Sequence, residues 1–274
     1  MTDGASDALT IAGLHVEQHG PADAPPLLLS PGLGGSGAYW APQIGSLAKA
    51  RRVILYDHRG TARSDRALPD ASVEAMADDM VAVLDGLGIA RADVIGHAAG
   101  GIAGLAMALK APERIGRLIV VNGWASPDPH FLRCFETRLA LLRDSGIGAY
   151  VRAQPLFLYP APWISPHLAR LDEEAAHHIA SFPGCETVER RIAALGAFDI
   201  TDRLGDIQVP LLVISAEDDM LVPFPAGSRL AAGVRGAAFA AMARGGHACN
   251  VTEPDAFNDV VSGFLNQIGP IPAA

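Results

Sequence analysis

The stretch that most constrains the fold of this chain is DVIGHAAGG, at residues 93–101. Its first residues suit a short buried strand, and the alanine- and glycine-rich residues after it predict a helix that runs to about Ala111. A strand, a sharp turn and a helix in this order form a nucleophile elbow, in which Gly-x-Ser-x-Gly raises a serine above a parallel sheet. Here Gly96 and Gly100 frame Ala98, so the sequence predicts an elbow that lacks its nucleophile.

The rest of the chain predicts an α/β fold around this elbow. Short, almost continuous apolar runs that end in turn residues are typical of strands covered on both faces. They lie at 25–30, 52–57, 116–123, 210–215 and, less clearly, 237–242, and a loosely alternating segment at 9–19 could form an antiparallel edge strand or hairpin arm. Helical patterns at 73–88 and from about Pro254 to Ile268 alternate with these runs. We therefore predict a mostly parallel central sheet flanked by helices.

Between residues 125 and 205 the alternation of strands and helices stops. Helical patterns take over at 131–142, 173–180 and 187–195, separated by the proline-rich segment 155–166. An all-helical insertion between two strands predicts a cap over the carboxyl edge of the sheet, where open α/β sheets place their active sites. We expect one catalytic domain made of a first core part at 1–124, a helical cap at 125–205 and a second core part at 206–274.

The composition excludes several classes of protein. The net charge of −9 argues against nucleic-acid binding, which needs a basic surface. No apolar run is long enough to cross a membrane, and the acidic N-terminus lacks the basic and apolar regions of a signal peptide. Three cysteines without a CxxC pair fit a reducing compartment. We expect a cytoplasmic protein that binds a small molecule and no nucleic acid, membrane, metal or cofactor, and we consider a homodimer as its assembly.

Two later positions could complete an acid–base site. Sequences with this elbow carry nucleophile, acid and histidine in that chain order. The acid candidate is Asp219, in the acidic turn SAEDDMLVP that leaves a predicted strand; Asp218 is the near alternative, and the spacing to the proline favours Asp219. The histidine candidate is His247, in the flexible GGHA loop before the last helix. Each could instead be an ordinary loop residue, but the order of the motifs favours the functional interpretation.

A second feature of the elbow is its oxyanion hole, which uses the backbone N–H after the nucleophile and another from an early strand loop. These donors would be Ala99 and Leu33, the latter in the SPGLG loop. Pro31 in the same loop has no N–H to donate. A plain glycine turn is the alternative interpretation of this loop.

Other chemically active residues suit structural roles better. His97 lies beside the elbow and is expected to pack. Cys249 shares a loop with His247, which makes the geometry of a substitute nucleophile awkward, so we expect a small buried apolar residue. The adjacent His177 and His178 suit a cap surface rather than a metal site, and the glycines at 32–37 do not match a phosphate-binding loop.

Together these motifs resemble the α/β-hydrolase superfamily along the whole chain, and the RutD family in particular. The segments that carry the closer resemblance are SPGLGGS (30–36), GHA (96–98), VNGW (121–124), RCF (133–135), QPLFLYP (154–160) and GGHACN (245–250). The resemblance implies a hydrolase of aminoacrylate or carbamate in the Rut pathway of pyrimidine, chiefly uracil, breakdown. It also implies that Ala98 is the native residue of the elbow. Many superfamily members have His-Gly where this chain has Ser30-Pro31, which leaves the Leu33 assignment open.

An elbow without a hydroxyl cannot form an acyl-enzyme, so we expect His247 and Asp219 to activate water directly. General-base help of roughly 10²–10⁴-fold would suffice only for a labile substrate. The substrates that the resemblance implies are small carboxylates that decompose unaided. We nominate Arg133 as their cationic contact, with a surface salt bridge as its alternative role.

The entrance to such a site would be narrow and apolar. The aromatic residues that could line it are Trp124, Phe157, Tyr159 and Trp163. Two other classes of function stay open at this point: a non-catalytic small-molecule-binding relic, and a lyase or cofactor-free oxygenase on the same scaffold.

Overall fold

The central feature of the fold is one eight-stranded sheet. The computed structural model describes residues 8–266, so the acidic N-terminal segment and the predicted helix end at Ile268 lie outside the described residues. The strand order is β1-β2-β4-β3-β5-β6-β7-β8. The strands are β1 (Leu9–Ile11), β2 (Leu14–His19), β3 (Pro26–Ser30), β4 (Arg52–Tyr56), β5 (Ala92–His97), β6 (Ile115–Val121), β7 (Leu211–Ala216) and β8 (Ala238–Met242).

Strand direction follows the prediction. β1 and β2 form an antiparallel hairpin at one edge, and β2 also pairs antiparallel with β4. Every pair from β4 through β3, β5, β6 and β7 to β8 is parallel. The carboxyl ends of these strands therefore meet along one edge of the sheet, as an α/β architecture requires.

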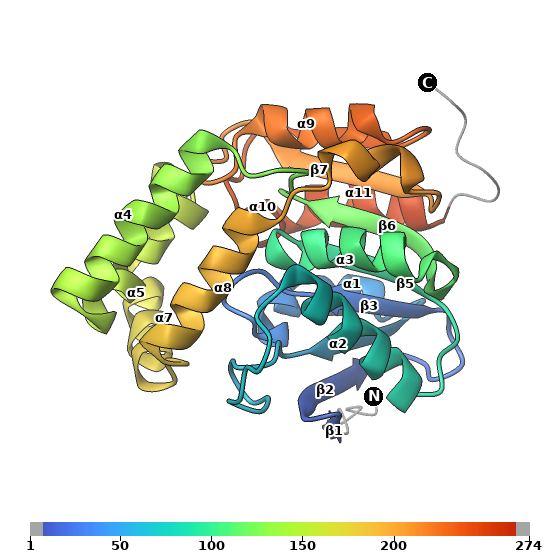
Figure 1. The fold of residues 1–274 in the computed structure, drawn as a ribbon, viewed down its shortest axis with the longest axis horizontal. Helices are drawn as coiled ribbons and strands as arrows, with labels where there is room; N and C mark the ends of the chain where they lie inside the picture. Colours follow the sequence, from blue (N-terminus) through green and yellow to red (C-terminus); the bar gives the residue numbers. More distant parts are fainter. Residues whose placement is uncertain (1–7, 267–274) are drawn as a thin grey trace.

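Helices cover both faces of the sheet, and each face has its own apolar core (Figure 1). The core of one face includes residues of α2 (Val73–Gly86), α3 (Ala99–Lys110) and α9 (Phe224–Gly233). The core of the other includes residues of α1 (Ala41–Leu47) and α11 (Pro254–Leu265). Helix α2 shows why such helices form: the Ser72 hydroxyl caps its N-terminus by accepting from the Ala75 N–H, and its buried residues recur at helical spacing.

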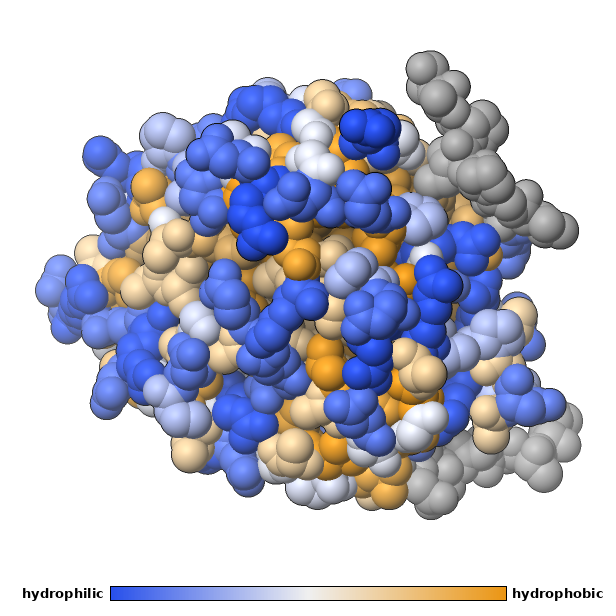
Figure 2. Space-filling model, turned by 45° about the vertical axis from the view of Figure 1, so that its right-hand side comes forward, coloured by the Kyte–Doolittle hydropathy of each residue, from blue (hydrophilic) through white to orange (hydrophobic). Residues whose placement is uncertain are grey.

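The outer surface is mixed in character. Figure 2 shows hydrophilic residues spread over one side of the molecule, with apolar residues visible between them. Within the described part of the chain, no helix combines the length and hydrophobicity that a membrane crossing requires.

The segment between β6 and β7 is helical and lies beyond the ends of the strands (Figure 1). Its helices are α4 (Pro129–Ser145), α5 (Ile147–Leu158), α6 (Ala161–Ile164), α7 (Leu168–Ala180) and α8 (Cys185–Ala197). One expectation was wrong here: Pro155 lies inside α5 instead of starting a linker. A proline near the end of a helix removes one hydrogen bond, and the helix needs few further bonds after it.

Candidate active site

The elbow places Ala98 in a strained backbone conformation between β5 and α3. Its φ is 46° and its ψ is −107°, a region that residues other than glycine rarely adopt. Two glycines make this turn possible: a Cβ on Gly96 would lie 2.3 Å from the Gly100 carbonyl oxygen, and a Cβ on Gly100 would lie 2.4 Å from that of Ser30. The turn therefore has the shape that presents a nucleophile, although Ala98 has no hydroxyl to present.

His247 and Asp219 form a buried pair at the same end of the sheet. The His247 Nδ1 lies 2.8 Å from Asp219 Oδ2, and the two side chains are 3% and 1% exposed. The other carboxylate oxygen, Oδ1, accepts from the N–H groups of Leu221 and Val222 at 2.8 and 2.9 Å. With Nδ1–H donating to this fixed carboxylate, Nε2 of His247 becomes the basic nitrogen.

The neighbouring carboxylate of Asp218 has a different environment. It accepts from the N–H groups of Gly245 and Gly246, at 3.2 and 2.8 Å, and so anchors the loop that carries His247. Of the two carboxylates that the sequence left open, the structure pairs Asp219 with the imidazole.

The backbone of His247 is held from the other side by His97 and Asn122. Its carbonyl oxygen accepts from His97 Nε2 and from Asn122 Nδ2, both at 2.7 Å. Burial and the nearby His247 ring lower the pKa of His97, and the hydrogen bond to the His247 carbonyl opposes them. The pKa of His97 is left well below its usual range. A neutral His97 thus braces the loop, which is more than the packing role expected from the sequence, and Asn122 was missed altogether.

The two segments that carry the expected oxyanion donors lie against each other. Ala99 is the first residue of α3, so its N–H has no carbonyl partner within the helix. The loop that contains Leu33 lies against the elbow, since a Cβ on Gly32 would be 2.7 Å from His97 Nδ1. The Leu33 carbonyl oxygen accepts from Arg191 Nη2 of α8 at 3.3 Å, which holds this loop to the helical insertion.

Arg191 belongs to a buried polar chain that sequence reasoning missed. Its Nη2 donates to His58 Nδ1 at 2.7 Å, and the Ser30 hydroxyl lies 3.2 Å from His58 Nε2 and 2.7 Å from the Tyr56 hydroxyl. Burial and the Arg191 charge hold the pKa of His58 well below its usual range, so this imidazole is neutral. Burial also lowers the pKa of Arg191 to about 10, partly opposed by Tyr56, Asp79 and Tyr150.

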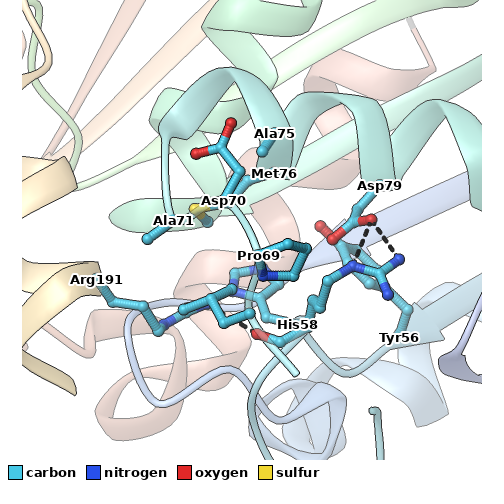
Figure 3. A pocket seen from close by; sticks show the side chains of 11 residues that line it. Tyr56, His58, Pro69, Asp70, Ala71, Ala75, Met76, Asp79 and Arg191 are labelled. Carbon is cyan, nitrogen blue, oxygen red and sulfur yellow. Dashed lines mark hydrogen bonds and ion pairs between the residues drawn. The ribbon is translucent and has the colours of Figure 1, made fainter. Parts of the chain in front are cut away.

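A small cavity borders this polar chain (Figure 3). It measures about 70 Å³, and its lining includes Tyr56, His58, Asp79 and Arg191. Asp79 forms an ion pair with Arg59 across 2.8 Å. Figure 3 shows Arg191 reaching from the insertion toward the loop that carries His58.

The aromatic residues nominated for substrate contact pack against other aromatic rings. Trp124 is buried against Phe131, with ring centroids 4.5 Å apart, and its indole N–H has no hydrogen-bond partner in the described structure. Tyr159 stacks on Trp163 at 4.5 Å, and burial raises the pKa of Tyr159 to about 12, with Glu174 adding to and Arg170 opposing the shift. The Leu158 carbonyl, just before Tyr159, accepts from Ala248 N, which joins this aromatic segment to the His247 loop.

Arg133, the nominated cationic contact, is not brought to the site by the structure. Its side chain is 80% exposed and forms an ion pair with Glu136, one turn along α4, across 3.0 Å. The nomination of Arg133 as a substrate contact was therefore wrong: it occupies the solvent face of its helix, and its charge is already paired.

The remaining chemically active groups do not enter the site chemistry. Cys249 is fully buried, and burial together with the nearby Asp219 raises the pKa of its thiol to about 12, so it is no nucleophile. Within residues 8–266, no group of three histidine, cysteine or acidic side chains is arranged to hold a metal ion.

Comparison with known proteins identifies the family of the chain. A family model described as "alpha/beta hydrolase fold" matches residues 25–146. A protein of Caulobacter segnis named "Putative carbamate hydrolase RutD" is 55% identical over 260 residues, which cover 93% of this chain and 97% of the relative. A protein of the same name from Agrobacterium fabrum is 48% identical and covers 92% and 98%.

Solved structures show the same fold. An enol-lactonase from Burkholderia xenovorans aligns with a TM-score of 0.85 at 28% identity, over 95% of this chain and all 100% of that one. A meta-cleavage product hydrolase from Pseudomonas fluorescens aligns with a TM-score of 0.78 at 25% identity, over 94% and 97%. The chain therefore belongs to the RutD family of α/β hydrolases.

Proposed function

We propose that the protein hydrolyses the C–N bond of a small labile carboxylate, a carbamate or 3-aminoacrylate, in pyrimidine degradation. One observation carries this proposal: a buried His247–Asp219 pair, 2.8 Å apart, accompanies an elbow whose Ala98 has no hydroxyl. A base oriented by a carboxylate can take a proton from water without a covalent intermediate.

The proposed reaction proceeds by direct attack of water. His247 Nε2 removes a proton from water as its oxygen bonds to the substrate carbon. For carbamate this carbon is the carboxyl carbon. The N–H groups of Ala99 and Leu33 donate hydrogen bonds to the oxygen on which negative charge develops. The protonated His247 then returns the proton to nitrogen as the C–N bond breaks, releasing ammonia and bicarbonate.

The same base serves 3-aminoacrylate through its imine tautomer. Water adds to the C3 carbon, which gives a carbinolamine, and cleavage of the C–N bond leaves ammonia and the three-carbon aldehyde acid. Asp219 stabilises the transient imidazolium in both reactions, as a carboxylate hydrogen-bonded to Nδ1 does in hydrolytic triads.

The expected acceleration matches a fragile substrate. General-base catalysis contributes roughly 10²–10⁴-fold, and one oxyanion donor roughly 10²–10³-fold. This is too little for a stable amide or ester, whose uncatalysed hydrolysis is far slower. Carbamate and aminoacrylate decompose unaided, so the catalysis that remains without a serine is enough for them.

The comparisons support this substrate class. The relatives are named for carbamate hydrolysis. The meta-cleavage product hydrolase of the same fold is a serine-to-alanine mutant complexed with acetates, which are small carboxylates.

The first test is turnover of carbamate and 3-aminoacrylate by His247→Ala. We expect ammonia release to fall by about 10²–10⁴-fold, measured above the spontaneous rate. His177→Ala, at an exposed histidine of α7, is the matched control and should keep the wild-type rate. Equal rates in wild type and His247→Ala would overturn the mechanism.

The second test asks whether the base and the oxyanion donors form a working set. Ala98→Ser restores a hydroxyl at the elbow, and we expect it to release p-nitrophenol from p-nitrophenyl acetate with a burst that marks an acyl-enzyme. The double variant Ala98→Ser/His247→Ala should lose that burst. If Ala98→Ser does not hydrolyse p-nitrophenyl acetate and the wild type does not turn over carbamate or 3-aminoacrylate, the chain is instead a small-molecule-binding relic of a hydrolase.

A further inference from the structure

A buried arginine in the helical insertion forms no ion pair with any residue between 8 and 266. Arg138 lies on α4 and is only 4% exposed. Its guanidinium carbon lies 4.9 Å from the ring centroid of Phe135, 5.3 Å from that of Tyr150 and 5.6 Å from that of Phe157. A positive charge is therefore enclosed by three aromatic rings.

The hydrogen bonds of Arg138 are incomplete. Nη2 donates to the Tyr150 hydroxyl at 3.2 Å, and Nε is buried without any partner. No carboxylate in the described part of the chain forms an ion pair with this guanidinium. Buried charges are normally paired, because removing them from water is costly, and a guanidinium carries five donors to satisfy.

Three contacts place this cation among the elements of the candidate active site. The first contact is the Cys134 thiol, one turn earlier on α4. Burial raises the pKa of this thiol, the charge of Arg138 lowers it and the charge of Asp219 raises it, so the sulfur lies within electrostatic range of both residues. Cys134 also lies 3.7 Å from the carbonyl oxygen of Met220, the residue after Asp219. Phe157 precedes Leu158, whose carbonyl binds the N–H of Ala248, next to His247.

The third contact runs through Tyr150 to the opposite side of the site. Tyr150 accepts from Arg138 and acts electrostatically on Arg191, which binds the Leu33 carbonyl. Both buried arginines leave Nε without a partner, but Arg191 donates to the His58 ring nitrogen and to the carbonyl oxygens of Leu33 and Arg59, whereas Arg138 donates to a single phenol. Of the two cations, Arg138 therefore has the fewer acceptors.

We propose that Arg138 binds the carboxylate of the substrate, so that a small anion completes the buried charge pair that the chain leaves open. The proposal rests on the proposed function for the identity of the anion. The planar guanidinium matches a carboxylate with two parallel hydrogen bonds, and the surrounding rings exclude water from that contact. For 3-aminoacrylate this carboxylate is remote from the reacting C3 carbon, so Arg138 would fix the position of the substrate and leave the chemistry to His247.

The test measures binding separately from turnover. The probe is 3-hydroxypropionate, an inert three-carbon carboxylate, and 3-hydroxypropionamide is its uncharged match. Calorimetry should show that the wild type prefers the carboxylate. Arg138→Met should weaken carboxylate binding by at least about 10- to 100-fold, the size of a single charge-assisted hydrogen bond, because two such bonds are lost, and it should leave amide binding unchanged.

Two further variants keep the test decisive. Arg143→Met removes an exposed arginine from the same helix, where it pairs with Glu189, and should bind both probes as the wild type does. Arg138→Lys keeps the charge but not the planar fork, so it should bind the carboxylate with intermediate affinity. It also replaces Arg138→Met if that variant does not fold.

Three outcomes decide the matter. Selective loss of carboxylate binding supports the assignment, even if no variant and no wild-type protein turns over aminoacrylate, in which case the proposed reaction alone fails. Carboxylate binding by Arg138→Met that equals wild type, with or without a lower melting temperature, would show that Arg138 only ties α4 to α5. Failure of the wild type to prefer the carboxylate over the amide would overturn the assignment as well.

Discussion

Two buried histidines at the carboxyl edge of the sheet have opposite partners. His247 has its Nδ1 2.8 Å from the Asp219 carboxylate, and His58 has its Nδ1 2.7 Å from the Arg191 guanidinium. Both rings are nearly inaccessible to solvent, at 3% and 2% exposure. The same residue type, equally buried, is thus given opposite electrostatic surroundings.

The partner decides what each imidazole can do. Beside a carboxylate, Nδ1 carries the proton and a transient positive charge is stabilised, which suits a general base. Beside a guanidinium, Nδ1 must accept, and a second positive charge is disfavoured, so His58 can only relay a hydrogen bond between Arg191 and Ser30. The sign of the neighbouring charge therefore determines whether the histidine suits a general base, as His247 does, or only a structural hydrogen bond, as His58 does.

The largest expected effect comes from removing the negative partner. In Asp219→Asn the amide N–H₂ can face Nδ1 and favour the tautomer with the proton on Nε2, which has no lone pair for water. We expect kcat for aminoacrylate or carbamate to fall by about 10²–10⁴-fold, with a melting temperature close to wild type. An unchanged kcat would show that the pair has no part in proton transfer.

Removing the positive partner should affect stability before chemistry. Arg191→Met leaves the His58 ring nitrogen and the Leu33 carbonyl without their donor, and each orphaned buried group costs about 1–3 kcal/mol. We expect the free energy of unfolding in urea to fall by about 2–6 kcal/mol, because each of the two groups adds a cost of that size.

The matched control for this variant is Arg170→Met. Arg170 is 55% exposed and pairs with Glu174 within α7, so its loss should change stability by less than about 0.5 kcal/mol. If both variants were equally stable, the polar chain from Arg191 to Ser30 would have no structural role.

Counted per residue, the smallest effect concerns pH. The pKa values of His58 and His97 lie well below 6.5 in the folded protein because both rings are buried, and His58 also faces Arg191. Below pH 6.5 these two histidines bind protons in the unfolded chain but stay neutral in the folded protein. Their contribution to the free energy of unfolding is therefore fully present above pH 6.5 and decreases as the pH falls. Each ring should contribute about 1.4 kcal/mol per pH unit.

Urea unfolding between pH 7.5 and 5 measures this slope. His58→Gln keeps a polar side chain but cannot titrate, so it should flatten the profile by the share of one ring. A wild-type profile that is flat below pH 6.5 would contradict the neutral, buried state of both histidines.

The fold was largely predictable because its signals are local. Continuous apolar runs marked β3, β4, β6 and β7, and the glycine frame of the elbow marked the turn at Ala98. The wrong expectation at Pro155 arose because a proline is a strong stop signal in isolation, whereas α5 tolerates it near its end.

The site was only partly predictable, because burial of a charge is a property of the packed structure. Arg133 and Arg138 are the same residue type in the same helix, yet Arg133 is exposed and Arg138 is enclosed by aromatic rings. A signal was present: Arg138 falls seven residues after Phe131 and three after Phe135, on the apolar face of α4. For Arg191 and Asn122, whose contacts lie far away in sequence, no comparable local signal exists.

The backbone at Ala98 has a consequence for the evolutionary reach of the fold. A left-handed, non-glycine conformation costs about 1–3 kcal/mol, and the surrounding glycines already enforce it. Alanine and serine codons differ by a single base, so the genetic step to a hydroxyl at this position is minimal and adds no new backbone strain. A single mutation at Ala98 therefore supplies the hydroxyl that covalent catalysis needs, and selection for either chemistry has to change little besides this side chain.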